Sequence, residues 1–442
     1  MDCSISYGVN SNKLMYILVG VISVVVLITI VLVLRGVGET TSKPVTLQFW
    51  GVFDDHNAFD KVISDFKVQN PGIDVKYQMF TFEQYEQGFV NALAAGTGPD
   101  ILMIHNTWLP KHGDKLAPMP ITGVPDTKNP FTTQNFKDQF VDVAYQDFVY
   151  NNQIYGLPLY ADTLGLYYNK DLFNSAGITR PPQTWDEVNT DVQLLTKFDK
   201  SGNITQSGFS LGTARNINRS TDILMDMMIQ SGVQMTSADQ RAATFGQTIN
   251  GQRVGEIAVQ YYTNFANPRN QNYSWNDSQH YSMDAFTEGT LGMMLGYAHN
   301  SQIIRSKAPR LNFAVAPMPQ ASLTDVRNFA NYWAVAVAVK SAHPIESWKF
   351  VNYLASKEGV TVYLNATNRP SARRDLIDLQ RTDPDLGVFA VQALSARSWF
   401  QADNKAIEGI FADMIDDVNF NRSSIRDAVA RAESRVTVLM QK

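Results

Sequence analysis

The segment VTLQFWGVFDDHNAFDKVISDFKVQNPGIDVKYQMF, residues 45–80, decides the fold class of this chain. Apolar residues alternate over 45–50, as in a β-strand, whereas residues 58–66 have the apolar spacing of a helix. The Asn-Pro-Gly sequence at 70–72 ends that helix, and residues 75–80 are predicted as a second strand. A strand, a helix and another strand in this order predict an α/β unit.

The same alternation continues in both directions along the chain. Residues 83–95 are predicted as a helix, and glycine and proline separate them from a buried strand at 100–104. Later segments predict a buried strand at 334–339, a helix at 345–355 and a final amphipathic helix at 425–439. This order of elements is typical of a parallel sheet flanked by helices.

An apolar run near the N-terminus predicts a membrane anchor. Residues 14–34 are 21 consecutive residues without a charge, which is long enough to cross a hydrocarbon core of about 30 Å as a helix. The run exceeds the apolar part of a cleavable signal, so we expect a retained transmembrane helix. Residues 1–13 are then a short cytoplasmic leader, and residues 35–44 are a linker to an extracytoplasmic region at the cell membrane. The small residues at 36–38 also fit a processing site, so cleavage remains the alternative.

Length, charge and cysteine content exclude several classes of protein. A chain of 442 residues is too long for one core, so we expect two lobes. The net charge of −5 and the absence of a basic cluster argue against nucleic-acid binding. Cys3 is the only cysteine, so the region after the anchor has no disulfide. Cys3 also precedes the apolar run, where a lipid-attachment cysteine would follow it.

Seven segments carry a resemblance to a known family. They resemble, in order and in spacing, the family 1 extracellular solute-binding proteins, the group of maltose and multiple-sugar receptors. The segments are VTLQFWG (45–51), FKVQNPGIDVKYQ (66–78), VNALAAGTGPDILM (90–103), YGLPLYADTLGLYYNKDLFNSAGI (155–178), PPQTWDEV (181–188), FTEGTLGMMLGY (286–297) and NFAVAPMPQ (312–320).

The resemblance implies a two-lobe periplasmic-binding-protein-like fold of type II, in which three hinge crossings join the lobes. Lobe 1 would comprise residues 45–158 and 334–372, and lobe 2 residues 162–330 and 376–442. The implied function is that of the substrate-binding component of an ABC importer, which captures a carbohydrate, expected to be an oligosaccharide, and delivers it to the permease subunits. We expect a monomer without cofactor, metal or catalytic activity.

A sugar has apolar C–H faces and a rim of hydroxyls, so its site needs aromatic rings beside planar hydrogen-bonding groups. We therefore expect ligand contacts from rings and polar side chains at strand ends and crossings. The candidates are Trp50, Asp54, Asn106, Trp108, Tyr160, Asp162, Tyr297, His299, Trp333, Trp399 and Asp403. The resemblance favours Asp54 and Asp162 as hydroxyl acceptors. The alternatives are a helix cap for Asp54, a hinge hydrogen bond for Asp162 and a place in the core for Trp108.

Other functions are weighed against this interpretation. His105 and His112 have no third ligand at a suitable spacing, which argues against a metal site. The sequence has no nucleophile elbow, no zinc-protease motif and no phosphate-binding loop. Two alternatives remain open. Carboxylates beside rings also suit a polyamine, and a phosphate ester would require Arg or Lys in the cleft. Asp54 and Asp162 could also flank a glycosidic bond in an anchored glycoside hydrolase.

Overall fold

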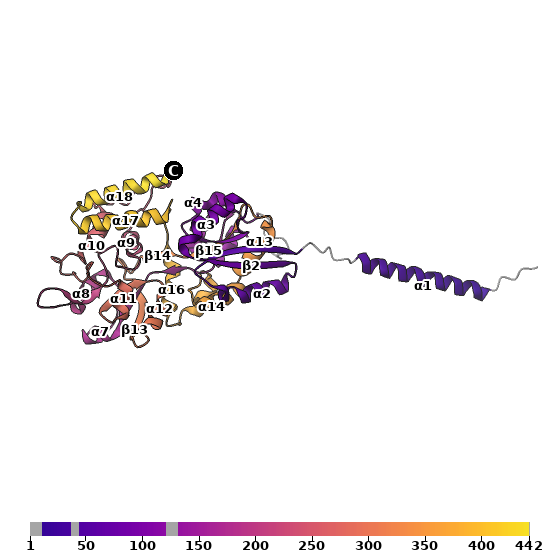
Figure 1. Cartoon of the computed structure of the whole chain (residues 1–442), viewed down its shortest axis with the longest axis horizontal. Helices are drawn as coiled ribbons and strands as arrows, with labels where there is room; N and C mark the ends of the chain where they lie inside the picture. The colour runs from indigo at the N-terminus through magenta and orange to yellow at the C-terminus, as the bar shows by residue number, and fades with distance from the viewer. Residues whose placement is uncertain (1–10, 37–43, 121–130, 442) are drawn as a thin grey trace, which may run out of the picture.

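The computed structural model describes residues 11–36, 44–120 and 131–441 (Figure 1). Residues 44–120 and 131–441 form two α/β lobes, each with its own sheet and its own cluster of buried apolar side chains. The two-lobe α/β fold predicted from the sequence is confirmed. Residues 1–10 of the predicted leader, most of the linker and residues 37–38 of the processing site at 36–38 lie outside the described residues.

The lobe 1 sheet is mixed rather than parallel. Its strands in order are β2 (Ile73–Phe80), β1 (Val45–Val52), β3 (Ile101–His105), β15 (Trp333–Ala338) and β4 (Leu116–Ala117), and β7 (Leu157–Pro158) also pairs with β15. β1 runs parallel to β2 and to β3, as predicted. β15 runs antiparallel to β3, with Trp333 opposite His105, so the sheet is not parallel throughout. The chain enters β15 at the edge where β3 ends, and it therefore runs back across the sheet.

Helices and short elements cover the lobe 1 sheet. They are η1 (His56–Ala58), α2 (Asp60–Gln69), α3 (Phe82–Ala95), α4 (Leu109–His112), η2 (Gly113–Lys115), α5 (Thr133–Gln139), α6 (Asp142–Phe148), β5 (Val149–Tyr150), β6 (Gln153–Ile154), α13 (Pro344–Leu354) and α14 (Lys357–Thr367). The predicted helix at 58–66 is divided into η1 and α2, since Asp55 caps η1 through the Asn57 N–H. α3 ends at Gly96, whose φ of 74° is a left-handed conformation that glycine adopts without a steric penalty.

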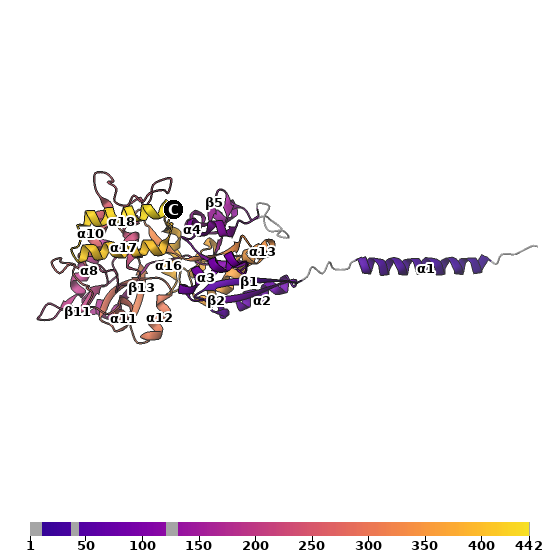
Figure 2. The same cartoon turned by 45° about the horizontal axis from the view of Figure 1, so that its top comes forward.

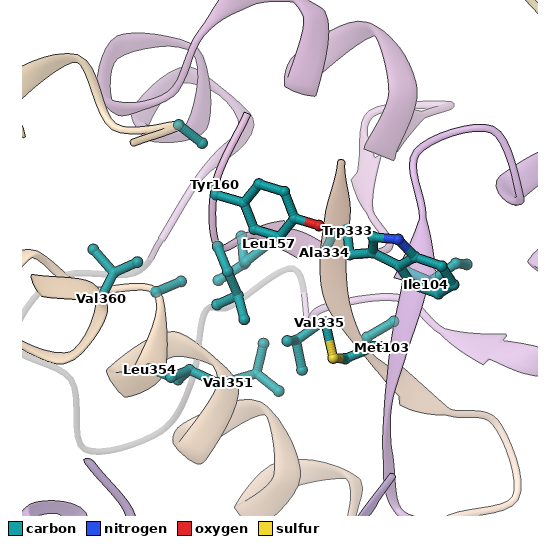
Figure 3. Packing of buried hydrophobic residues seen from close by; sticks show 14 of the residues in the cluster. Met103, Ile104, Leu157, Tyr160, Trp333, Ala334, Val335, Val351, Leu354 and Val360 are labelled. Atoms are coloured by element: carbon teal, nitrogen blue, oxygen red, sulfur yellow. The ribbon is translucent and has the colours of Figure 1, made fainter. Parts of the chain in front are cut away.

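The lobe 1 core lies against both faces of β15. All six residues of β15 are buried, as are the five of β3 beside it. Val335 lies between Met103 of β3 and Leu157 of β7, and Val351 and Leu354 of α13 approach from the helical side (Figure 3). A strand that contributes side chains to both sides of a sheet needs apolar residues at every position, which explains the unbroken sequence WAVAVA.

Lobe 2 has a second mixed sheet. Its strands in order are β10 (Lys197–Phe198), β11 (Ile204–Phe209), β12 (Leu291–Gly296), β9 (Gly165–Asn169) and β13 (Phe313–Pro317). Its helices are α7 (Lys170–Ser175), α8 (Trp185–Leu195), α9 (Ser220–Gln230), α10 (Val254–Asn264), α11 (Ser282–Thr287), α12 (Asn300–Lys307), α16 (Gly387–Gln392), α17 (Asn404–Asn419) and α18 (Ile425–Met440). α17 and α18 pack side by side on this lobe (Figures 1 and 2).

A small sheet lies where the chain passes between the lobes. Its strand order is β16 (Ala396–Arg397), β14 (Asn328–Asn331) and β8 (Asp162–Thr163). Asp162 pairs with Asn331, and Asn328 pairs with Ala396. Further along the chain, α15 (Arg374–Gln380) begins next to Arg373, and η3 (Ala393–Ser395) precedes β16. The sheet gives the two lobes a common base, and two of its residues, Asp162 and Asn331, line a cavity between the lobes.

The N-terminal segment forms one helix, α1 (Ser11–Gly36), which has 26 residues. In the parts of the chain that the structure describes, no helix is found that is both long and apolar enough to span a membrane.

Candidate functional site

A cavity of about 290 Å³ lies between the lobes, beside the small sheet. Lobe 1 and the crossings contribute residues from the ends of β1, β2 and β3 and from the start of β15, and lobe 2 contributes the ends of β12 and the starts of α9 and α17. Its lining is Phe53, Phe82, His105, Tyr160, Asp162, Arg219, Tyr297, His299, Asn331, Trp333, Arg369, Asn404 and Glu408. The cavity is therefore built mostly from residues at the ends of strands and the beginnings of helices.

One wall of the cavity is aromatic. The rings of Phe53 and Phe82 stack at 5.6 Å between centroids, and both meet the edge of Trp333 at 5.9 and 6.4 Å. Phe53 has a φ of 68°, an unusual conformation for a bulky residue. Such strain persists only where the surroundings enforce it, and here it directs an exposed ring into the cleft. The aromatic wall is thus an apolar surface made of two stacked rings and a third ring nearly perpendicular to them.

Asp162 lies at the base of the cavity. Its side chain is 3% exposed, and its oxygens accept hydrogen bonds from the backbone N–H groups of Thr163 (2.9 Å) and Ala298 (3.0 Å). Burial raises the pKa of Asp162 to about 7, although the positive charge of Arg369 opposes the shift. Backbone N–H groups hold this carboxyl in place, and lone pairs remain for a further donor.

Arg369 joins the cavity to the lobe 1 core. Its Nη2 donates to Asp54 Oδ1 at 2.7 Å, and its guanidinium lies 4.4 Å from the ring centroid of Tyr160. The second oxygen of Asp54 accepts from the Tyr363 hydroxyl at 2.8 Å. The Nε of Arg369 is buried and has no hydrogen-bond partner among the described residues. Asp54 is therefore occupied on both oxygens by side chains of its own lobe.

A hydrogen-bonded network forms the opposite wall. The Tyr297 hydroxyl donates to Asp222 Oδ2 at 2.7 Å, and Asn331 Nδ2 donates to the same oxygen at 3.3 Å. Asn331 Oδ1 in turn meets His105 Nε2 at 3.2 Å. Burial lowers the pKa of His105 to about 4, so this imidazole is neutral at pH 7. The network fixes the orientations of the side chains of His105, Asp222, Tyr297 and Asn331.

Arg219 and Glu408 form the remaining polar part of the lining. Arg219 lies 4.0 Å from Asp222 Oδ2 and 3.8 Å from Glu408 Oε1, and its guanidinium lies over the Tyr297 ring. Its backbone is left-handed, with a φ of 58° at the position before α9. Burial, together with the charge of Asp222, raises the pKa of Glu408 to about 7. Both side chains are only partly exposed, so a ligand here would meet groups that water screens poorly.

His299 projects into the cavity without a hydrogen bond to any residue that the structure describes. Its ring lies nearly parallel to that of Tyr297, with 6.4 Å between centroids. The surface of His299 is open to the cavity, but protein atoms of both lobes surround the imidazole and remove much of the water near it. This desolvation, with the positive charges of Arg369 and Arg219, lowers the pKa of His299 to about 4. A neutral imidazole can donate one hydrogen bond and accept another.

The structure brings together five of the predicted site residues in this cavity. These are Tyr160, Asp162, Tyr297, His299 and Trp333. Two others, Asn106 and Trp399, line a second cavity of about 670 Å³ between the lobes. There Asn106 Nδ2 donates to the half-buried Asp147, which also accepts from the hydroxyls of Tyr332 and Ser398.

Four predicted residues line neither cavity. Trp50 packs on Phe80, with 4.5 Å between ring centroids, and Asp54 is held by Arg369 and Tyr363 as described above. Trp108 is buried in the core and donates from Nε1 to Asn404 Oδ1 at 3.0 Å. Asp403 caps α17 and accepts from Lys111 at 2.7 Å. Each of these residues has a structural partner that spacing along the sequence does not reveal.

Sequence reasoning missed several residues of the lining. Phe53 and Phe82 lie just after the ends of β1 and β2, and a position near a strand end was a usable signal. The predicted aromatic contacts with the sugar included only Trp and Tyr, so both Phe residues were missed. Arg219 directly precedes α9, but its side chain does not cap that helix and lines the cavity instead. Arg369 lies in the loop after α14, and Glu408 lies within α17. No motif in the sequence around either residue indicates that it lines a cavity.

Known proteins with related sequences and folds were compared with the chain. The family model described as bacterial extracellular solute-binding protein matches residues 51–361. A putative binding protein of Brucella abortus (strain 2308) is 27% identical over 305 residues, which cover 68% of this chain and 69% of that protein.

Solved structures share the fold. A solute-binding protein of an ABC transporter from Thermotoga lettingae, bound with α-D-tagatose, superposes with a TM-score of 0.70 and 23% identity over 90% of this chain and 100% of that one. The cyclic α-maltosyl-1,6-maltose binding protein of Arthrobacter globiformis gives a TM-score of 0.74 and 20% identity over 90% and 99%. The two-lobe architecture is therefore shared along nearly the whole of each of these chains.

Proposed function

Because this chain belongs to the family of bacterial extracellular solute-binding proteins, we propose that it captures a neutral sugar between its lobes and delivers it to the permease of an ABC importer. The observation that carries the proposal is the division of the cavity into an aromatic wall and a polar wall. A sugar ring placed between them would rest its C–H face on Phe53, Phe82 and Trp333. Its hydroxyls would meet Asp162, His299 and Glu408.

The balance of charge in the lining favours a neutral ligand. Arg369 is paired with Asp54, and Arg219 lies between Asp222 and Glu408. Among the described residues of the lining, neither guanidinium is therefore free of a carboxylate and able to hold a phosphate ester. A polyamine would need ionised carboxylates, whereas burial raises the pKa of both Asp162 and Glu408 to about 7. Hydroxyl groups can use either protonation state, because they donate and accept hydrogen bonds.

Several of the similar proteins are sugar receptors, and one is the sn-glycerol-3-phosphate-binding protein UgpB of Shigella dysenteriae, at 23% identity over 76% of this chain. Both structural neighbours are sugar receptors, one bound with α-D-tagatose and the other a cyclic α-maltosyl-1,6-maltose binding protein. A maltodextrin-binding protein of Bacillus subtilis (strain 168) is also similar, at 23% identity over 63% of this chain.

Binding would close the two lobes about their crossings. We place lobe 1 at 45–158 and 334–372 and lobe 2 at 162–330 and 376–442, so that the hinge includes β8 and the step from β14 into β15. X-ray scattering with and without ligand tests this motion. An unchanged radius of gyration at saturation would rule closure out.

We further infer that residues 14–34 anchor the receptor in the cell membrane, with the lobes outside. The support is the sequence itself, in which residues 14–34 are 21 consecutive residues without a charge. Membrane fractionation of the native protein tests this inference. Recovery of a soluble form that begins near residue 39 would contradict it.

A thermal-shift panel of sugars, polyamines and phosphate esters tests the ligand class. A ligand that binds the folded state raises the melting temperature by mass action, and we expect this only from sugars. Incubation of the best sugar oligomer with the protein separates a receptor from a glycoside hydrolase. We expect tight binding without cleavage, since the family and its structural neighbours are binding proteins. Product release would favour the hydrolase, and a response to polyamines alone would refute the sugar.

A further inference from the structure

The two cavities between the lobes are neighbours along the same loops. His105 lines the smaller cavity, and Asn106, Thr107, Leu109 and Pro110 line the larger one. From lobe 2, Phe400 and Gln401 line the larger cavity, whereas Asn404 lines the smaller one. Residues 108–111 and 403–404 lie where the linings of the two cavities meet. Contacts between these two segments therefore separate the cavities.

Two contacts make this join, and we call their four residues, Trp108, Lys111, Asp403 and Asn404, the inter-lobe clasp. Trp108 Nε1 donates to Asn404 Oδ1 at 3.0 Å, and Lys111 Nζ lies 2.7 Å from Asp403 Oδ2. Trp108 also meets the edge of Trp333, with 5.0 Å between ring centroids, so the clasp continues directly from the aromatic wall.

Further contacts within each lobe hold Lys111 and Asp403 of the clasp in position. Lys111 lies 2.7 Å from Glu86 of its own lobe as well as from Asp403, and a hydrogen bond from His112 is the main reason why the pKa of Glu86 falls to about 2. Asp403 is held in place as the cap of α17 by the Ala406 N–H. The lysine and aspartate side chains are only 30% and 29% exposed, so water screens their attraction less than at an open surface. Fixed partners lower the entropy lost when the lobes meet.

We propose that the inter-lobe clasp ends the sugar cavity and limits this receptor to ligands of one or two sugar rings. The inference rests on the proposed function and changes its expected ligand from an oligosaccharide to a short saccharide. A volume of about 290 Å³ is at the lower end for small-molecule sites, which span roughly 300–1,000 Å³. The larger cavity of about 670 Å³ would take further rings, but the clasp lies across the way to it.

The test measures affinity against chain length on the full-length protein. Linear glucose oligomers of one to four rings are titrated by calorimetry against the parent and against Trp108→Phe. The variant keeps a buried ring but removes the donor to Asn404 and narrows the clasp. Trp348→Phe is the matched control, because Trp348 is fully buried in the same lobe, its Nε1 has no partner among the described residues, and it lines neither cavity.

The parent should bind the best of the one- and two-ring sugars at least about tenfold more tightly than the three- and four-ring sugars. Trp108→Phe should reduce this preference by about tenfold, and Trp348→Phe should leave it unchanged. Lys111→Met, a change at a partly exposed position, should act in the same direction if Trp108→Phe unfolds the protein. Equal affinity of the parent for oligomers of every length would overturn the role of the clasp, and so would variants that weaken the binding of every oligomer equally. Either result would leave the proposal of a sugar receptor intact. Failure of every saccharide to bind would overturn both proposals.

Discussion

The substitution Asp54→Asn separates a structural role for this carboxylate from direct contact with ligand. Asp54 and Arg369 are 7% and 15% exposed, and their atoms lie 2.7 Å apart. Removing one charge from a buried pair leaves the other uncompensated, which costs about 3–5 kcal/mol. Asparagine retains one acceptor for Arg369 or Tyr363, so we expect a loss of about 3 kcal/mol in the free energy of unfolding.

Equilibrium urea unfolding measures this loss, and the denaturant slope should stay unchanged. Asp55→Asn is the matched control, since it makes the same chemical change one residue along. Asp55 is exposed, and its role as a cap suits asparagine equally well. A stability of Asp54→Asn within about 1 kcal/mol of Asp55→Asn, combined with lost sugar affinity, would refute the structural assignment and make Asp54 a ligand contact.

Three further expectations concern the site and the fold. Phe53→Ala and Phe53→Gly should both weaken sugar binding by about tenfold, but the glycine variant should be more stable by about 1 kcal/mol, because φ is positive at this position; calorimetry and thermal melting check the two effects. The pKa of Asp162 is about 7 in the folded state and 3.8 in the unfolded state, so the folded state binds more protons between these values. Stability should therefore fall as pH rises from about 4 to about 7, and melting curves of Asp162→Asn should show a smaller fall. Gly255→Ala would place a Cβ 1.9 Å from the Phe245 carbonyl oxygen and should destabilise the protein by more than about 2 kcal/mol, whereas Gly88→Ala in α3 meets nothing within 4 Å and should stabilise it slightly in the same urea assay.

Periodicity predicted the elements of lobe 1 closely. The strand expected at 334–339 is β15 (Trp333–Ala338), and the helix expected at 345–355 is α13 (Pro344–Leu354). Such segments are readable because burial on one or both faces constrains which residues they contain. The direction of β15 was not readable, since it depends on where the chain returns from the other lobe rather than on the strand's own residues.

The site was less accessible to sequence reasoning, for a physical reason. Ring and carboxyl chemistry predicted Asp162 and Trp333, which line the cavity, but it also selected Trp108 and Asp403, which join the lobes. The partner that decides the environment of Asp54 is Arg369, 315 residues away along the chain. The fold brings these two residues together, and the sequence around Asp54 does not indicate the contact.

The place of β15 also sets the order in which the protein can fold as it is synthesised. This strand lies in the middle of the lobe 1 sheet, between β3 and β4, yet the whole of the lobe 2 sheet is made before it. Synthesis proceeds at about 5–20 residues per second, so the interval between His105 and Trp333 lasts on the order of tens of seconds. During that time β3 has an unpaired edge where β15 belongs. The lobe 1 sheet is thus completed only after every strand of the lobe 2 sheet has been made.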